Sequence, residues 1–183
     1  LLALFRFWNV IDRFFPYKDL MDQSWDRTLL EFIPKMEAAG NALEYTLAVA
    51  ELTARIQDSH GMIINPIYAR YMGRLNPAVQ VSYVEGLSVI SLIKDSALKK
   101  KGIDLGDIVL SVDGEKTEAR RARLKKFLPA STTGRLEAKV DMTLLAGDPE
   151  KPAAISLRKA SGKIVNVTLP RTQEVPLRPE PSP

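Results

Sequence analysis

The chain of 183 residues has no cysteine, which excludes several kinds of chemistry at once. Disulfide scaffolds, thiol nucleophiles, paired-cysteine redox motifs and cysteine-ligated zinc all need a side chain that is missing. Only one histidine is present, His60, so a site built from several histidines is excluded as well. Acid–base chemistry by an imidazole near neutral pH would have to use this residue. The ten glycines are scattered and form no phosphate-binding or dinucleotide-binding motif, so we expect no cofactor. With no cysteine and a single histidine, we expect no metal site either.

Long apolar runs are also missing. The most apolar N-terminal stretch, 1–15, is too short and too charged to cross a bilayer, and it lacks the basic start and the small-residue cleavage site of a signal peptide. The chain begins without an initiator Met inside an amphipathic pattern, so we expect a piece of a longer protein. The formal charge of +4 says little about a binding partner. A hydrophobic content of 45% is enough for one large or two small hydrophobic cores.

Residues 1–65 are expected to form a helical domain. Apolar residues recur at three- and four-residue steps over 1–15, which predicts a helix that ends at Pro16. A second helix is predicted over 25–39 with a kink at Pro34, and a third over 41–57, where Asn41 and Glu44 have the spacing of a capping box. The aromatic residues of this third of the chain are expected to fill the core.

From residue 76 the hydrophobic period changes from nearly four to two, which predicts strands. We expect a linker at 66–75 and a second domain over 76–172. The expected strands are 79–84, 87–93, 108–112, 153–159 and 163–169, and the expected helices are 96–101, 118–128 and 135–146. The segment 173–183 is proline-rich and is expected to be an extended linker to a missing catalytic domain.

Residues 97–114 resemble the signature of a PDZ domain of the bacterial type, with an alanine ahead of the first glycine, then a Gly-Asp pair and a closing Asp-Gly pair. The glycines close a short helix and permit tight turns, so the motif itself is architectural. The fold class implied is α+β: a small N-terminal helical bundle followed by a PDZ-like, partly open β-barrel or sandwich with two or three helices.

PDZ domains bind extended peptides by adding a strand at a sheet edge beside a helix. By this resemblance the groove would lie between 79–84 and 118–128. Its expected peptide-binding residues are Val79, Val81, Tyr83, Leu124 and Leu128. The preceding loop contains Pro77, which has no amide donor for a carboxylate, so the domain either binds peptide or serves as a gate or spacer.

A second resemblance covers nearly the whole chain. Its motifs are Trp-Asn-Val-Ile at 8–11, Phe-Phe-Pro-Tyr-Lys at 14–18, Trp-Asp at 25–26, Ile-Pro-Lys at 33–35, Asp-Ser-His at 58–60, Leu-Pro-Ala-Ser-Thr at 128–132 and Val-Thr-Leu-Pro-Arg at 167–171. These segments resemble the tricorn-like branch of the carboxyl-terminal processing, or tail-specific, serine peptidases. In that branch a helical segment and a PDZ domain precede an α/β domain with the nucleophilic serine.

The tricorn-like resemblance implies roles for two residues. His60 would be the general base and Ser59 a neighbour that helps to orient the catalytic groups, while the nucleophile and an acidic partner would come from the absent domain of the same polypeptide. Asp58 is interpreted as a structural residue of the turn rather than as the triad acid. The fragment alone should be inactive. The resemblance also implies a peptide or unfolded protein as substrate and export to the periplasm or cell surface, and it leaves the oligomeric state open.

Two alternatives remain open. The chain could be a non-catalytic adaptor that binds protein termini through its PDZ domain, with His60 as a structural residue. The basic run 120–126 could suggest nucleic-acid binding, but no aromatic residues for base stacking surround it. We therefore interpret these charges as the solvated face of a short helix and expect no nucleic-acid partner.

Overall fold

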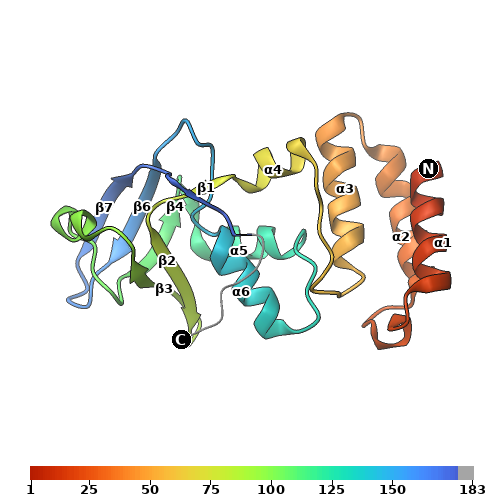
Figure 1. Ribbon diagram of the computed structural model, residues 1–183, viewed down its shortest axis with the longest axis horizontal. Coiled ribbons are helices and arrows are strands. Elements are labelled where there is room, and N and C mark those ends of the chain that lie inside the picture. Colours follow the sequence, from red (N-terminus) through yellow and green to blue (C-terminus); the bar gives the residue numbers. More distant parts are fainter. Residues whose placement is uncertain (177–183) are drawn as a thin grey trace. The chain divides into compact units, whose positions relative to one another are not determined.

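The computed structural model describes residues 1–176, and these residues form two compact units (Figure 1). The first unit comprises Leu1–Tyr68 together with Lys126–Thr133, and the second comprises Ala69–Lys125 and the chain from Gly134 onward. The predicted α+β class, a helical part followed by a partly open sheet structure, is confirmed. The segment 126–133, which we call the strap, is grouped with the helical unit.

Capping side chains mark the starts of two of the helices in the first unit. The helices of this unit are α1 (Leu2–Phe14), the 3₁₀ turn η1 (Lys18–Leu20), α2 (Trp25–Ala38) and α3 (Ala42–Ala54). Ser24 caps α2 by accepting a hydrogen bond from the Arg27 N–H, and Asn41 caps α3 by accepting from the Glu44 N–H. Helix α2 continues through Pro34 as one element. Helix α3 ends at Ala54, three residues earlier than predicted.

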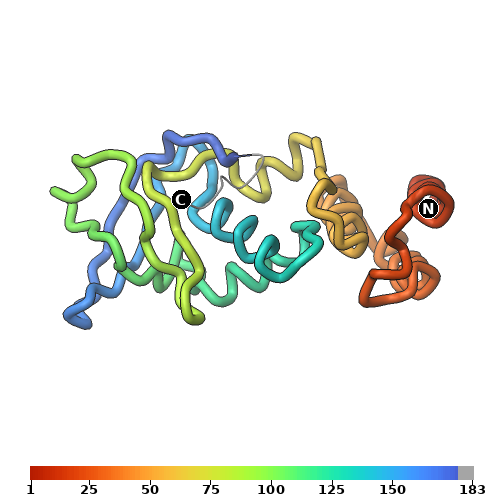
Figure 2. The backbone as a smooth tube through the Cα atoms, turned by 60° about the horizontal axis from the view of Figure 1, so that its bottom comes forward, coloured from red at the N-terminus to blue at the C-terminus, as the bar shows by residue number. Residues whose placement is uncertain are grey.

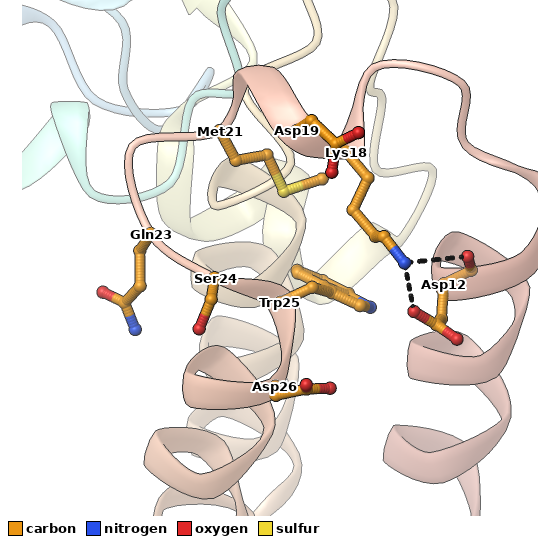
Figure 3. Close-up of a pocket in the computed structure, with 8 residues that line it drawn as sticks. All are labelled: Asp12, Lys18, Asp19, Met21, Gln23, Ser24, Trp25 and Asp26. Atoms are coloured by element: carbon orange, nitrogen blue, oxygen red, sulfur yellow. Dashed lines mark hydrogen bonds and ion pairs between the residues drawn. The ribbon is translucent and has the colours of Figure 1, made fainter.

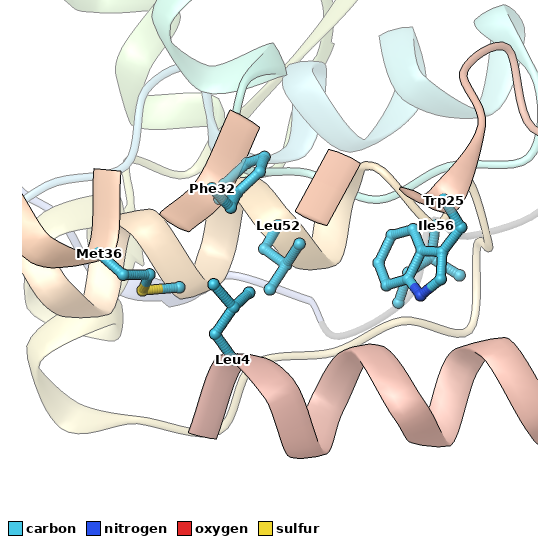
Figure 4. Packing of buried hydrophobic residues seen from close by; sticks show 6 residues of the cluster. All are labelled: Leu4, Trp25, Phe32, Met36, Leu52 and Ile56. Carbon is cyan, nitrogen blue, oxygen red and sulfur yellow. The ribbon is translucent and has the colours of Figure 1, made fainter. Parts of the chain in front are cut away.

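The core of the first unit lies between these helices, with α2 between α1 and α3 (Figure 1). Trp8 and Trp25 exchange hydrogen bonds, each indole N–H donating to the other residue's carbonyl oxygen at 3.0–3.1 Å. Each ring therefore packs against apolar neighbours while its only polar group has a partner. The buried cluster, drawn in Figure 4, consists of Leu4, Trp25, Phe32, Met36, Leu52 and Ile56.

The second unit is built on an antiparallel sheet with the strand order β2-β3-β4-β6-β7, and β5 pairs with β4. Its strands are β2 (Val79–Val84), β3 (Leu87–Ile93), β4 (Ile108–Val112), β5 (Glu115–Lys116), β6 (Ala153–Arg158) and β7 (Ile164–Leu169). Its helical segments are η2 (Ser96–Lys101), α5 (Thr117–Lys125) and α6 (Thr133–Thr143), of which η2 is a 3₁₀ helix. The β2–β3 and β6–β7 hairpins can be followed in Figure 2. Strands β2 and β7 form the two edges, so the sheet does not close into a barrel.

The expected linkers carry structure. Helix α4 (Pro66–Met72) lies within the predicted linker 66–75. Strand β1 (Leu75–Asn76) pairs with β8 (Gln173–Glu174), so the start of the predicted tail is part of the second unit rather than free chain. The rest of that tail, 177–183, lies outside the described residues. Within residues 1–176 no helix has the length and apolar character needed to span a membrane.

Candidate functional site

His60 lies on a tight turn that follows α3. The backbone at Gln57 has a positive φ of 57°, which reverses the chain after the helix, and the Gly61 N–H donates to the Asp58 carbonyl oxygen at 3.0 Å. One carboxylate oxygen of Asp58, Oδ1, accepts a hydrogen bond from the His60 N–H at 2.9 Å and lies 3.0 Å from Nδ1 of its ring. The His60 side chain is 89% exposed, so the imidazole projects outward from the turn.

Ser59 is held by the strap. The Ser59 N–H donates to the Ser131 hydroxyl at 2.9 Å, the Ser131 N–H donates to the Ser59 hydroxyl at 3.0 Å, and the two hydroxyls are 3.1 Å apart. Tyr68 adds a hydrogen bond of 3.0 Å from its hydroxyl to the Phe127 carbonyl oxygen, and burial raises the pKa of Tyr68 to about 12. The strap therefore braces the turn that presents His60.

Close packing accompanies these hydrogen bonds at Gly61. A Cβ atom at Gly61 would lie 3.0 Å from two carbons of the Pro129 ring. Contacts that tight require a neighbour to move, and Pro129 is a rigid ring. The close approach of the strap therefore favours glycine next to His60.

The five predicted peptide-binding residues do not form one open strip. Val79, Val81 and Leu124 are only 5%, 6% and 1% exposed, so they offer almost no surface to a peptide. Tyr83 is 39% exposed, and Leu128 is half-buried in the other compact unit.

The edge of β2 is covered at Tyr83 by side chains. The Tyr83 N–H donates to Oδ2 of Asp141 on α6 at 2.9 Å, and the Arg121 guanidinium of α5 stacks on the Tyr83 ring at 3.9 Å. Strand addition by a peptide needs free backbone groups along such an edge. At this position the backbone donor already has a partner within the second unit.

Arg121 connects three elements around this edge. It donates to Asp141 and to Glu137, each at 2.5 Å, and to the Ser88 hydroxyl at 3.1 Å. Burial raises the pKa of the Asp141 carboxyl. Burial alone would raise the pKa of Glu137 too, but hydrogen bonds from Lys125 and Arg121 outweigh it and lower that pKa.

The expectation that the basic run 120–126 is a solvated face is wrong for two of its arginines. Arg120 and Arg121 are 7% and 5% exposed. Arg120 donates to the carbonyl oxygens of Leu144 and Ala146 at 2.7 and 2.6 Å. The guanidinium groups of Arg120 and Arg121 are buried and bonded to internal partners, so they do not offer contacts to a phosphate backbone.

Each unit has a pocket of about 360 Å³. One lies in the helical unit, where the Lys18 ammonium group points to Asp12 at 2.5 Å (Figure 3). The other lies between β3, β4 and α5 and includes Tyr83 and Arg121 in its wall. Neither contains His60, and the described residues hold no cluster of three or more histidine, aspartate or glutamate side chains fit for a metal ion.

Sequence reasoning missed Ser131, Arg121 and Asp141. Ser131 lay inside a segment that matched the family pattern, and its distance of 72 positions from Ser59 gave no local sign of contact. Asp141 sits in an ordinary helical pattern, and nothing in the sequence indicates that it bonds to the edge of β2.

Comparison with known proteins gives a fold and no family. No protein-family model matches the chain, and no curated protein matches it. Among solved structures, mature chlamydial CPAF superposes with a TM-score of 0.67 at 14% identity, over 92% of this chain and 33% of that one. CPAF complexed with lactacystin superposes with a TM-score of 0.64 at 14% identity, over 92% of this chain and 34% of that one. A serine-to-alanine mutant of CPAF superposes with a TM-score of 0.66 at 16% identity, over 94% of this chain and 34% of that one. The chain thus shares a fold with about a third of CPAF.

Proposed function

We propose that this chain is the helical and PDZ-like part of a serine peptidase, in which His60 is the general base for a serine nucleophile outside these 183 residues. The observation that carries the proposal is the presentation of the only imidazole of the chain, 89% exposed on a turn braced by the strap. A lone histidine that served only to cap a helix would not need such bracing. The exposed ring is instead suited to reach a group on another domain.

The fold likeness supports the same assignment. CPAF is a serine protease, and the matched region is about a third of its length. A chain that corresponds to one third of a protease would lack some of the catalytic groups. We therefore place the nucleophile and the acidic partner on another part of the polypeptide.

The chemistry assigned to His60 is general-base catalysis. A serine hydroxyl becomes an effective nucleophile when an imidazole within hydrogen-bond reach accepts its proton. The serine oxygen then bonds to the peptide carbonyl carbon, the C–N bond breaks, and the imidazolium returns the proton to the leaving amine. Water hydrolyses the acyl-enzyme in a second step that uses the same base. The substrate would be a peptide or an unfolded protein segment.

For the second unit we favour a gate or spacer over capture of peptides by strand addition at β2. The Tyr83 N–H is bonded to Asp141, and the inward side chains Val79 and Val81 are buried. The same observations weaken the alternative of a PDZ adaptor, because an adaptor would need this edge to be open.

Hydrolysis of an unstructured fluorogenic peptide by the longer protein tests the proposal. His60→Ala should lower kcat at least about 100-fold, the lower range for loss of a general base. Glu150→Ala, on an exposed turn of the second unit, should leave the rate unchanged and serves as the control. The 183-residue chain alone should show no hydrolysis. Undiminished activity of His60→Ala, or comparable activity of the isolated chain, would overturn the assignment.

A further inference from the structure

Asp58 contacts His60 in a way that a simple turn does not require. Its Oδ1 atom accepts the His60 backbone N–H at 2.9 Å, which is the ordinary contact of an aspartate that closes a turn. The same oxygen also lies 3.0 Å from Nδ1 of the imidazole. The backbone contact alone would complete the turn, so the ring contact is an additional constraint on the side chain.

The chemistry of the two groups determines which ring nitrogen carries the proton. An ionised carboxylate can only accept hydrogen bonds, so a neutral imidazole beside it must place its hydrogen on Nδ1. The Nε2 atom then holds the free lone pair. Because the side chain is 89% exposed, the basic nitrogen belongs to a ring that other groups can approach.

The backbone around the pair is fixed from both directions. Ser59, between the two residues, is joined to Ser131 by reciprocal hydrogen bonds of 2.9 and 3.0 Å. The Gly61 N–H closes the turn on the Asp58 carbonyl oxygen. The Asp58 side chain is 31% exposed, so its contact with the ring adds little to folding stability, as is usual for exposed ion pairs. The contact between Asp58 and the ring instead affects the orientation and the tautomer of the imidazole.

We propose that Asp58 is a positioning residue that holds His60 as the Nδ1–H tautomer and so makes Nε2 the proton acceptor. The inference rests on the proposed function of His60 as a general base. When Nε2 accepts the serine proton, the positive charge on the ring is stabilised by the Asp58 carboxylate, which keeps its own charge. The acidic partner that the family resemblance assigns to another domain would then act on an imidazole that is already oriented.

The first test needs no catalytic activity. Nitrogen-15 NMR of the 183-residue chain, recorded where His60 is neutral, distinguishes the two tautomers by the chemical shifts of Nδ1 and Nε2. We expect Nδ1–H to predominate in the wild type and in Asp58→Asn, because one amide oxygen in the place of Oδ1 can still accept both the backbone N–H and the ring N–H. Asp58→Ala removes this acceptor and should shift the neutral ring toward the Nε2–H form. Asp26→Ala, which removes an exposed carboxylate from the same unit, should behave as the wild type.

An Nε2–H majority in the wild type, or identical spectra for the wild type and Asp58→Ala, would overturn the inference. Thermal unfolding of the same samples checks that each variant is folded.

The second test uses peptide hydrolysis by the longer protein and separates the inference from the proposed function. Asp58→Ala should lower kcat at least about tenfold with little change in KM, since a base in the wrong tautomer fails in the chemical step. If His60→Ala abolishes hydrolysis while Asp58→Ala is fully active, His60 is the base and the role of Asp58 is refuted. If His60→Ala is fully active, the proposed function itself fails, whatever tautomer NMR reports.

Discussion

Replacement of Arg121 by alanine tests whether the packing of α5 and α6 at the edge of β2 depends on a buried charge. The Arg121 side chain is 6% exposed and forms ion pairs with Glu137 and Asp141. Removing one partner of a buried ion pair costs about 3–5 kcal/mol, because the remaining charge is left without compensation. Two contacts soften this loss: Asp141 keeps its hydrogen bond from the Tyr83 N–H, and Glu137 keeps its bond from Lys125.

Loss of the guanidinium stack on Tyr83 adds to the cost. A cation over an aromatic ring contributes about 0.5–2 kcal/mol, depending on its exposure to solvent. Taking the low end of the ion-pair range and of the stacking range, we expect Arg121→Ala to lower the free energy of unfolding of the second unit by about 3–4 kcal/mol. With a urea m-value of about 2 kcal/mol/M, the midpoint should fall by roughly 1.5–2 M.

The assay is urea unfolding followed through amide NMR signals of β2 and β3, because both tryptophans, Trp8 and Trp25, lie in the helical unit. Lys125→Ala is the matched control. Its side chain is 35% exposed, so we expect a loss of no more than about 1 kcal/mol. Equal losses for Arg121→Ala and Lys125→Ala, or a loss below about 1 kcal/mol for Arg121→Ala, would refute the reasoning.

The same variant should show a pH dependence of known sign. Burial already raises the pKa of Asp141 in the folded protein, and removal of Arg121 takes away the cation that opposes this shift. A carboxyl whose pKa is higher in the folded than in the unfolded state binds its proton more tightly when folded, so its contribution to stability rises as pH falls through the folded pKa. The deficit of Arg121→Ala relative to the wild type should therefore be smaller near pH 4 than near pH 7, which urea unfolding at the two pH values measures.

Two further predictions concern the cores of the two units. Phe32→Ala should destabilise the helical unit by about 3–5 kcal/mol, because this ring is fully buried, whereas Leu30→Ala on the same helix, 70% exposed, should change thermal unfolding by less than about 0.5 kcal/mol. Gly73→Ala should prevent stable folding of the second unit, because the φ of Gly73 is +93° and a Cβ atom there would lie 2.4–2.8 Å from the backbone of 146–147. Gly86→Ala is the control, because the φ of Gly86 is +83° but no atom lies within 4 Å of its added Cβ. Circular dichroism of the two variants separates the clash from the cost of the left-handed conformation, which is about 1–2 kcal/mol.

Helix boundaries and turns could be predicted from the sequence where their causes are local. Ser24 and Asn41 cap helices because their side chains reach N–H groups three residues ahead. Gly102 ends η2 in the left-handed region, and the Asp113-Gly114 pair reverses the chain after β4. Each of these depends on a few neighbouring residues, so a single sequence contains the necessary information.

Burial of charged groups could not be predicted in the same way. Whether Arg121 is solvated or buried depends on Glu137 and Asp141, which lie 16 and 20 positions further along the chain. The pairing of Ser59 with Ser131 spans 72 positions. The position of His60 after the third helix was predicted, but the strap that braces it depends on tertiary contacts that leave no periodic pattern in the sequence.

We propose that His60 activates a serine that lies elsewhere in the polypeptide. Labelling of the longer protein with a fluorophosphonate, which reacts with activated serines, tests this proposal when the wild type is compared with His60→Gln. We expect the wild type to be labelled on a serine outside these 183 residues, and His60→Gln to be labelled at least about 100-fold more slowly. Equal labelling rates for the two proteins, or labelling of a serine within this chain, would contradict it.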